Sequence, residues 1–449
     1  MTKTVDRKTI ETRPKAIAID GQAIDAGRRQ LLRLSGAAAL LSAARLALPS
    51  GAFAQTAGPE VKGTRLGYIA LTDAAPLVIA KEKGLFAKYG LPDMDIAKQA
   101  SWGATRDNMA LGFKANGIDG GHILRPKTHL YATGKVMQNS QPLPMYTLLN
   151  LNEDGQAISV SNEYKDLDVQ KDSSPLKQAF ERKKAAGKEL TAAMTFPGGT
   201  HDLWLRYWLA AGGIDPDTDI KVITVPPPQM VANMKVGTMD CFCVGEPWNE
   251  QLVNQNIGYT ALTTGELWSR HPEKVLGMRA DFVDANPKAT QAILMAVMEA
   301  QIWADKKENR QELAEIVGKR QWFNVPVNDI NKRLLGDINY GNGREVKGTN
   351  LQMKFWGEGG STSYPWKSLD TWFVTENIRW GKFEPTIDIK ALVDKTNRAD
   401  LWREAAKTLG VAGAPSADSR GVETFFDGVK FDPAAPMDYL KALKIKRVA

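Results

Sequence analysis

The stretch "FPGGTHDLWLRYWLAAGG", Phe196 to Gly213, contains the pattern on which the fold is built. An apolar run, "LTAAMTF", leads into a Pro-Gly-Gly turn, and a helix with an apolar body follows. Strand, tight turn and helix in this order are typical of an α/β protein. His201 is one of four histidines in 449 residues. It stands at the helix start, where free N–H groups favour an anion and where Thr200 is free to cap the helix.

Three more segments have the same design: "TDAAP" (72–76), "QASWG" (99–103) and "CVGEPW" (243–248). Each of them carries the end of a strand through a short turn into the start of a helix. In an open parallel sheet, such turns lie at one edge, where ligands bind. Several helix starts that face one cleft make an anion site before any side chain is counted.

The spacing of these signals predicts two lobes. Strands and helices alternate from Arg65 to Leu124, until two apolar runs surround Asn-Glu-Asp-Gly in "MYTLLNLNEDGQAISVS" (145–161). We interpret this segment as the crossing into a second lobe, with a return near "HPEKVLGMR" (271–279). The predicted lobes are 60–155 together with 268–449, and 156–267. Parallel-type sheets and hinge crossovers are expected in both.

The first 54 residues are predicted to be a leader for export. Arg28 and Arg29 precede a moderately apolar run that ends in the small-residue triplet Ala52-Phe53-Ala54, which is typical of a twin-arginine signal peptide. Residues 1–54 hold nine Lys/Arg and four Asp/Glu, so they carry +5 of the whole-chain charge of +7. The remaining chain is close to neutral and has no basic stripe, so we expect no nucleic-acid partner.

Cys241 and Cys243 are expected to form part of a buried strand. Residues two apart on a strand point to the same face, which is too strained for an ordinary disulfide, and a metal site would need more ligands nearby. We therefore predict no metal and no cofactor.

In their joint order, these segments resemble the periplasmic nitrate-binding proteins of ABC importers, in the group that also contains bicarbonate-binding relatives. The resemblance covers nearly all of residues 60–400, and the segments "GTHDLWLRYWL" and "FCVGEPWN" are specific to this group. It implies a two-lobed periplasmic binding protein fold of type II that closes about a hinge. It also implies a monomer that captures nitrate or nitrite and delivers it to the membrane subunits of an importer.

The resemblance places the anion contacts at five positions: Trp102, Gln156, His201, the main chain at Gly245, and Lys274. Nitrate is flat, singly charged and a weak acceptor, so it needs donors spread around three oxygens. Indole, carboxamide, imidazole and backbone N–H groups are all donors. Lys274 is expected to supply the full positive charge.

Three alternatives remain open at this point. In the bicarbonate-binding relatives, the resemblance implies an acidic residue at the Lys274 position and a bound calcium ion. A cytosolic nitrate sensor of the same fold would lack an export leader. Pyrimidine-synthesising enzymes share the fold but carry a run of cysteines near "CFC", whereas this chain has two cysteines in alternation. We see no nucleophile paired with a base, so the chain is predicted not to be an enzyme.

The leader gives a direct prediction about export. Changing Arg28 and Arg29 to Lys together should leave unprocessed precursor in the cytoplasm, because the twin-arginine route reads this pair. Fractionation followed by immunoblotting measures this, and mass spectrometry of exported parent protein should find Gln55 at the N-terminus. Normal delivery of the double variant would mean that another pathway is used.

Overall fold

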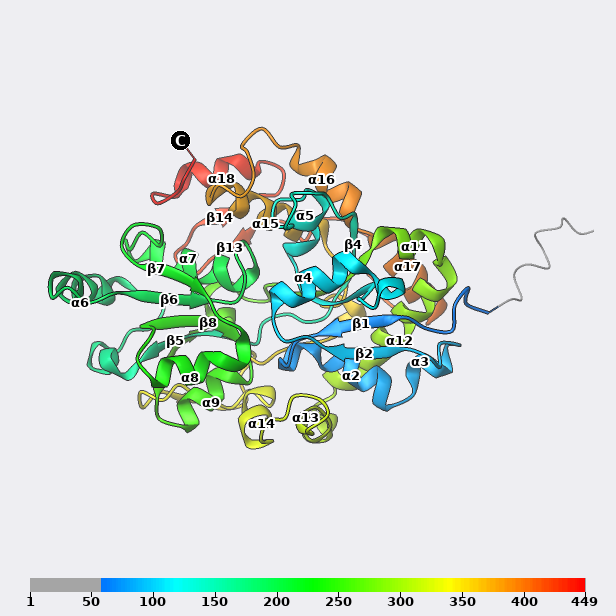
Figure 1. Ribbon diagram of the computed structural model, residues 1–449, viewed down its shortest axis with the longest axis horizontal. Coiled ribbons are helices and arrows are strands. Elements are labelled where there is room, and N and C mark those ends of the chain that lie inside the picture. Colours follow the sequence, from blue (N-terminus) through cyan, green and yellow to red (C-terminus); the bar gives the residue numbers. More distant parts are fainter. Residues whose placement is uncertain (1–57, 449) are drawn as a thin grey trace, which may run out of the picture. The chain divides into compact units, whose positions relative to one another are not determined.

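The computed structural model describes residues 58–448, so the predicted leader lies outside the described residues. The remainder forms an α/β fold with two five-stranded sheets in this range, each flanked by helices (Figure 1). The strand orders are β2-β1-β3-β10-β4 and β7-β6-β8-β5-β9. In the described range, each helix is too short or too polar to cross a lipid bilayer.

The strands of the first sheet are β1 (Arg65–Tyr68), β2 (Asp95–Lys98), β3 (Gly120–Leu124), β4 (Met145–Asn150) and β10 (Lys274–Arg279). Those of the second sheet are β5 (Gln156–Ser161), β6 (Thr191–Met194), β7 (Lys221–Thr224), β8 (Cys241–Gly245) and β9 (Gly258–Thr263). Two short hairpins lie outside both sheets and consist of β11 (Ile338–Asn339) with β12 (Glu345–Val346), and β13 (Glu423–Thr424) with β14 (Lys430–Phe431).

The helices up to β10 are α2 (Ala75–Glu82), α3 (Leu85–Lys88), α4 (Trp102–Leu111), α5 (Lys127–Ala132), α6 (Ser174–Ala185), α7 (Thr200–Ala211), α8 (Met230–Lys235), α9 (Trp248–Asn254) and α10 (Thr264–Leu267). Those after β10 are α11 (Ala280–Ala285), α12 (Pro287–Asp305), α13 (Arg310–Gly318), α14 (Asn328–Leu334), α15 (Lys367–Arg379), α16 (Ile389–Thr396), α17 (Ala399–Thr408) and α18 (Pro436–Ala442).

Each sheet contains one strand that runs against its neighbours. β10 is antiparallel to β3 and β4, and β5 is antiparallel to β8 and β9, whereas β1 pairs in parallel with β2 and β3, and β6 with β7 and β8. β5 and β10 are the strands that the chain enters directly after crossing between the sheets. They therefore begin at the edge where the parallel strands end. These sheet memberships support the proposal that residues 156–267 form the second lobe.

Local signals explain most of the element boundaries. Serine is a preferred N-cap, so Ser101 is predicted to begin a helix, and its hydroxyl accepts from the Ala104 N–H at 3.1 Å as the N-cap of α4. From its sequence, Asp73–Gly90 is predicted to be a single helix; this prediction is wrong, because the segment is divided into α2 and α3 at Gly84, whose φ is +67°. A left-handed residue of this kind ends a helix. Thr200 does not cap α7, whose N-cap is Gly199.

Between the two sheets, segments that are far apart in the sequence lie side by side. Glu153 forms antiparallel bridges with Pro272 and with Lys354, so the chain leaving the first sheet meets the chain returning to it. The turns after β1 and β8 also touch, through a bond from Thr72 N–H to the Glu246 carbonyl at 2.8 Å.

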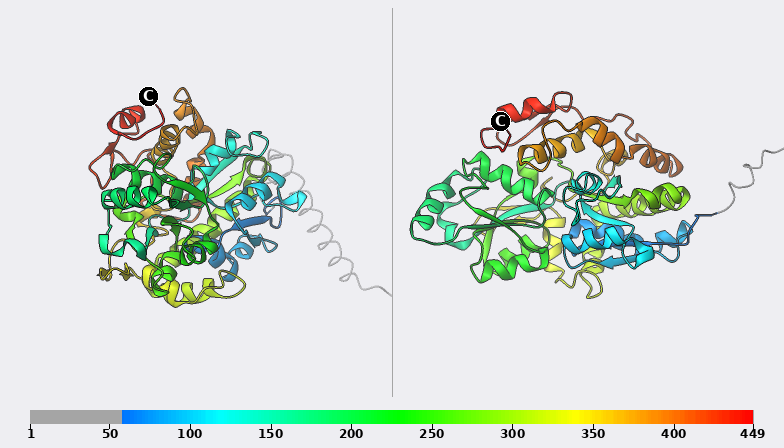
Figure 2. Two further views of the ribbon diagram at one scale, coloured as in Figure 1. Left: turned by 60° about the vertical axis from the view of Figure 1, so that its left-hand side comes forward. Right: turned by 45° about the horizontal axis from the view of Figure 1, so that its top comes forward.

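The C-terminal segment packs against both halves of the described chain, and Figures 1 and 2 show it in orange and red beside both sheets. Trp372 of α15 stacks on Trp204 of α7 with ring centroids 5.1 Å apart, and it also contacts Trp268 and Phe425. α17 lies against β4 and α12 of the first sheet. The last hundred residues therefore fasten the outer helices of the two halves to each other.

This aromatic cluster gives a stability prediction. Trp372 is fully buried, so Trp372→Ala should lower the free energy of unfolding by about 3–5 kcal/mol, because a large cavity remains. Urea unfolding followed by circular dichroism measures this. Val236→Ala is the control, since Val236 is 72% exposed and its truncation should stay within about 0.5 kcal/mol of the parent. A Trp372→Ala variant as stable as the parent would show that this cluster does not hold the segment.

Candidate functional site

Gln156 and Gly245 face each other where the two sheets meet. Gln156 begins β5 and Gly245 ends β8, and the two are partners in the antiparallel register. A Cβ atom at position 245 would lie 2.4 Å from Oε1 of Gln156, which is too close for any real contact. Position 245 must therefore be glycine for the Gln156 carboxamide to occupy this place.

His201 contacts Gln156 directly. It is the second residue of α7, and its Nε2 lies 3.0 Å from Oε1 of Gln156, while its Nδ1 lies 2.6 Å from the Thr195 hydroxyl. A carboxamide oxygen is an acceptor, so Nε2 carries the proton and Nδ1 accepts from Thr195. Burial, together with the nearby charge of Lys274, lowers the pKa of His201 to about 3. The imidazole is therefore neutral at physiological pH and offers one N–H.

Lys274 begins β10 and is fully buried. Its Nζ lies 2.8 Å from Oδ2 of Asp73, 2.9 Å from Oε1 of Glu273 and 3.4 Å from Oε1 of Gln156. Burial alone would lower the pKa of Lys274, but the two carboxylates outweigh it and raise that pKa above its ordinary value. The ammonium is therefore charged, and its charge is shared between two carboxylates.

Asp73 connects several of these groups. Its carboxylate accepts from Lys274, from Nε2 of Gln156 at 3.0 Å and from Nε2 of His122 at 2.6 Å. Burial opposes its ionisation, but Lys274 and His122 hold the pKa of Asp73 far below its ordinary range. Asp73 is therefore an anion. It already accepts hydrogen bonds from Gln156 and Lys274, which were expected to bind the ligand.

Glu273 connects the first sheet to α7. Its carboxylate accepts from Thr200, from Nε1 of Trp204 at 2.7 Å and from Lys274. The hydroxyl expected to cap α7 is thus used by this carboxylate. The bonds fix the start of α7, and with it His201, against the start of β10.

Trp102 lies at the same edge, where within residues 58–448 its side chain forms no hydrogen bond with Gln156, His201 or Lys274. It begins α4, and its ring is 5.3 Å from the ring of His122. Within residues 58–448, its buried indole Nε1 has no hydrogen-bond partner. A buried N–H without a partner is costly, so this group is available to a ligand.

The five predicted site residues therefore lie in one neighbourhood. Gln156, His201 and Lys274 contact one another, Gly245 makes room for Gln156, and Trp102 is joined to them through His122 and Asp73.

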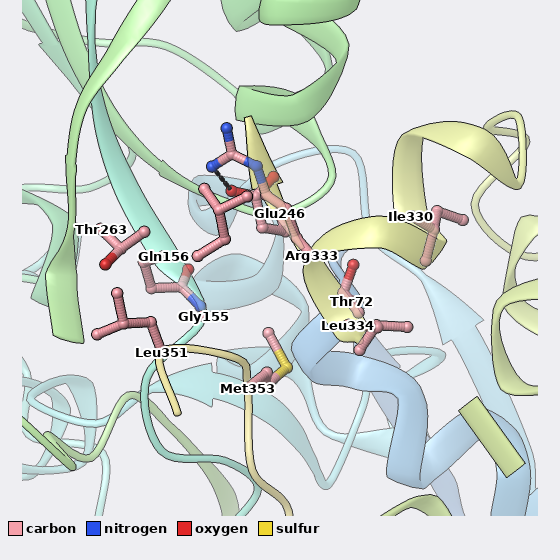
Figure 3. A pocket seen from close by; sticks show the side chains of 11 residues that line it. Thr72, Gly155, Gln156, Glu246, Thr263, Ile330, Arg333, Leu334, Leu351 and Met353 are labelled. Atoms are coloured by element: carbon pink, nitrogen blue, oxygen red, sulfur yellow. Dashed lines mark hydrogen bonds and ion pairs between the residues drawn. The ribbon is translucent and has the colours of Figure 1, made fainter. Parts of the chain in front are cut away.

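A small cavity borders this cluster at Gln156 (Figure 3). Its volume is about 20 Å³, enough for a water molecule, and Thr72, Glu246 and Arg333 are among its lining residues. Arg333 comes from α14 and pairs with Glu246 at 2.7 Å. The hydroxyl of Thr72 is buried and has no partner in the described range. The segment after β10 thus closes the site on this side.

Sequence reasoning missed Asp73, His122 and Glu273. Asp73 lies inside the quoted "TDAAP" turn and Glu273 directly precedes Lys274, so both were visible as charges in segments expected to lie near the site. Helix-start carboxylates usually point to solvent, and no local pattern shows which of them is buried. His122 lies at the middle of the buried strand β3, and the sequence gives no reason to distinguish it from an ordinary core residue.

Comparisons with known proteins identify the family to which the chain belongs. Residues 57–318 match the model of the NMT1-like family. The chain is 58% identical over 401 residues to the nitrate/nitrite binding protein NrtA of Synechococcus elongatus, covering 89% of this chain and 90% of that protein. It is 47% identical over 397 residues to the bicarbonate-binding protein CmpA of the same organism, covering 86% and 88%.

A solved structure is similar over the same range. The crystal structure of the periplasmic nitrate-binding protein NrtA from Synechocystis PCC 6803 superimposes with a TM-score of 0.84 at 57% identity, covering 87% of this chain and all of that one. The two-lobed periplasmic binding protein fold predicted from the sequence is thereby confirmed. The chain belongs to the NMT1-like family, in the group of periplasmic solute-binding proteins that contains the nitrate- and bicarbonate-binding members.

Proposed function

We propose that this protein captures nitrate, or nitrite, between its two lobes in the periplasm and delivers it to an ABC importer. The proposal rests on the contacts among Gln156, His201 and Lys274 where the two sheets meet. These contacts occur in a chain that is 58% identical to a nitrate/nitrite binding protein. A twin-arginine leader, action as a monomer and the five-residue anion site are parts of the same proposal.

The chemistry of the cluster suits a small monoanion. The His201 imidazole and the Gln156 carboxamide are neutral donors, and the Trp102 indole is a donor without a partner in the described range. Because the site is buried, each bond to an anion is stronger than it would be in water. In the structure, His201 donates to Gln156 and Gln156 donates to Asp73, so an anion would replace these contacts.

Bicarbonate with calcium is the nearest rival. Lys274 argues against it, because its ammonium already occupies the place beside Asp73 and Glu273 that a metal cation would need. The identity of 47% to the bicarbonate-binding relative, against 58% to the nitrate/nitrite-binding one, points the same way.

An enzymatic role is disfavoured by the state of the two cysteines. Both lie on β8, are fully buried and form no disulfide. Burial raises the pKa of the Cys243 thiol well above its ordinary value, and the pKa of Cys241 also rises. A thiol that stays protonated is neither a nucleophile nor a good metal ligand.

Calorimetric titration tests the assignment. We expect saturable binding of nitrate and nitrite, because each is a small monoanion that the neutral donors can surround. Bicarbonate with calcium, and taurine, should give no saturable heat at the same concentrations. Tight bicarbonate binding that needs calcium would place the chain with the bicarbonate-binding members instead.

A single N–H of Trp102 provides the sharpest test of the site. Trp102→Phe removes an indole N–H that has no partner in the described range, so the unliganded fold should keep its stability. A hydrogen bond to a charged group contributes about 1.5–3 kcal/mol, so nitrate affinity should fall about tenfold to about a hundredfold.

Trp372→Phe is a matched control. Its indole N–H is also buried without a partner in the described range, but it lies in the aromatic cluster beside α7. Calorimetry should give this variant the affinity of the parent. Equal affinity in Trp102→Phe and the parent would remove Trp102 from the site.

A further inference from the structure

Lys127, the first residue of α5, is a buried lysine without an acidic partner in the described range. It is fully buried, and its Nζ donates to the Trp102 carbonyl at 3.0 Å. Among the described residues, no carboxylate forms an ion pair with it. Aromatic rings surround it instead, with ring centroids 3.8 Å away at Phe196, 4.7 Å at Trp102 and 5.4 Å at Tyr131.

The position of Lys127 ties it to the candidate site. It follows β3, whose last residue, Leu124, is the register partner of Lys274. Trp102 belongs to the turn after β2, and Phe196 begins the turn that leads to His201 in the second sheet. The ammonium therefore lies where turns of the two sheets meet, beside a residue that is proposed to bind the anion.

Two unused polar groups accompany it. The Nε1 of Trp102 and the hydroxyl of Tyr131 are both buried and have no hydrogen-bond partner within residues 58–448. Both can donate, and so can the two remaining protons of the Lys127 ammonium. Buried donors without partners are rare in folded proteins, and three in one contact group indicate a ligand that accepts.

The buried cluster around Lys274 holds one more acidic group than basic groups. Lys274 carries +1, and Asp73 and Glu273 carry −1 each, so this group has a net charge of −1. His201 and His122 do not change the count, because burial lowers the pKa of each. Other nearby charges are already paired, Arg125 with Asp370 and Arg206 with Asp202. Without the charge of Lys127, an anion that enters the site would therefore meet a net negative charge.

Lys127 in turn lacks the anion that its burial requires. Burial lowers the pKa of Lys127 well below its ordinary value, and the charge of Arg106 adds to this effect while Asp107 opposes it. An unpaired buried ammonium costs folding free energy, and cation–π contacts recover only part of that cost. A bound anion would supply the missing partner.

We propose that Lys127 is a further anion-binding residue. Asp73 and Glu273 already neutralise the charge of Lys274, so Lys127 would provide the positive charge for the bound anion. This inference rests on the proposed capture of a small anion at the same site. The alternative is that Lys127 only fills the space between three aromatic rings. The two hypotheses predict different nitrate affinities when the positive charge of Lys127 is removed.

Lys127→Met separates them, because methionine keeps a similar length and removes the ammonium. Nitrate affinity measured by calorimetry should fall by about tenfold to about a hundredfold, as expected when an anion loses a buried counter-charge. The unfolding temperature without nitrate should stay the same or rise, since an unpaired buried charge is gone. Lys127→Gln keeps a donor for the Trp102 carbonyl but no charge, and its affinity should fall similarly.

Lys83→Met is the matched control. Lys83 also lies over an indole ring, 4.0 Å from the centroid of Trp303, but it forms an ion pair with Glu312 on the surface. Removing this charge should leave nitrate affinity unchanged.

Parental affinity in Lys127→Met or in Lys127→Gln would overturn the inference. So would loss of the folded state in both variants, since a charge that serves the ligand is dispensable for the unliganded fold. Failure of the proposed function would be distinct, because the parent protein itself would then give no saturable heat with nitrate or nitrite.

Discussion

The buried cluster of Lys274 with Asp73 and Glu273 is the constraint on which the site depends. Taking one ammonium and two carboxylates out of water costs several kcal/mol per ion unless each is paired and hydrogen-bonded. The pairing recruits Thr200 and Trp204 from α7 to Glu273, and Gln156 from β5 to Asp73. The first sheet supplies the charges and the second supplies neutral donors. Satisfying the charges therefore brings the two facing edges together.

This constraint changes what a Lys274 variant would report. From the sequence alone, Lys274 is expected to be a free cation, and its removal is expected to weaken only the binding of the ligand. In the structure, its removal would leave Asp73 and Glu273 buried beside each other without their shared counter-ion. Breaking a buried pair in this way destabilises a protein by about 3–5 kcal/mol. A loss of nitrate binding in such a variant would not distinguish a ligand contact from a damaged site, whereas the indole N–H of Trp102 has no such structural duty.

The sequence predicted the four turns and their common edge, because Gly, Pro and Ser between apolar runs identify strand-to-helix turns locally. It could not predict that β5 and β10 run against their neighbours. Strand direction follows from the route of the chain, and this route places Gln156 and Lys274 at strand starts. It also missed β9, as well as the packing of Trp372 on Trp204, which joins residues far apart in the chain. Asp73 and Glu273 were missed for a similar reason, since burial of a charge depends on distant partners.

The same charges bear on which anions the site would accept. On the proposal that Lys127 is protonated when an anion is bound, Lys127 and Lys274 together balance Asp73 and Glu273. A monoanion then leaves one net negative charge in a buried place, and a dianion would leave two. The energy of buried charge rises steeply with its amount, and like charges repel strongly at low dielectric. On this proposal, the two carboxylates would act against sulfate- or phosphate-like dianions, while the neutral donors of Gln156, His201 and Trp102 would suit a planar monoanion. Specificity of this kind needs a repulsive element beside the attractive one.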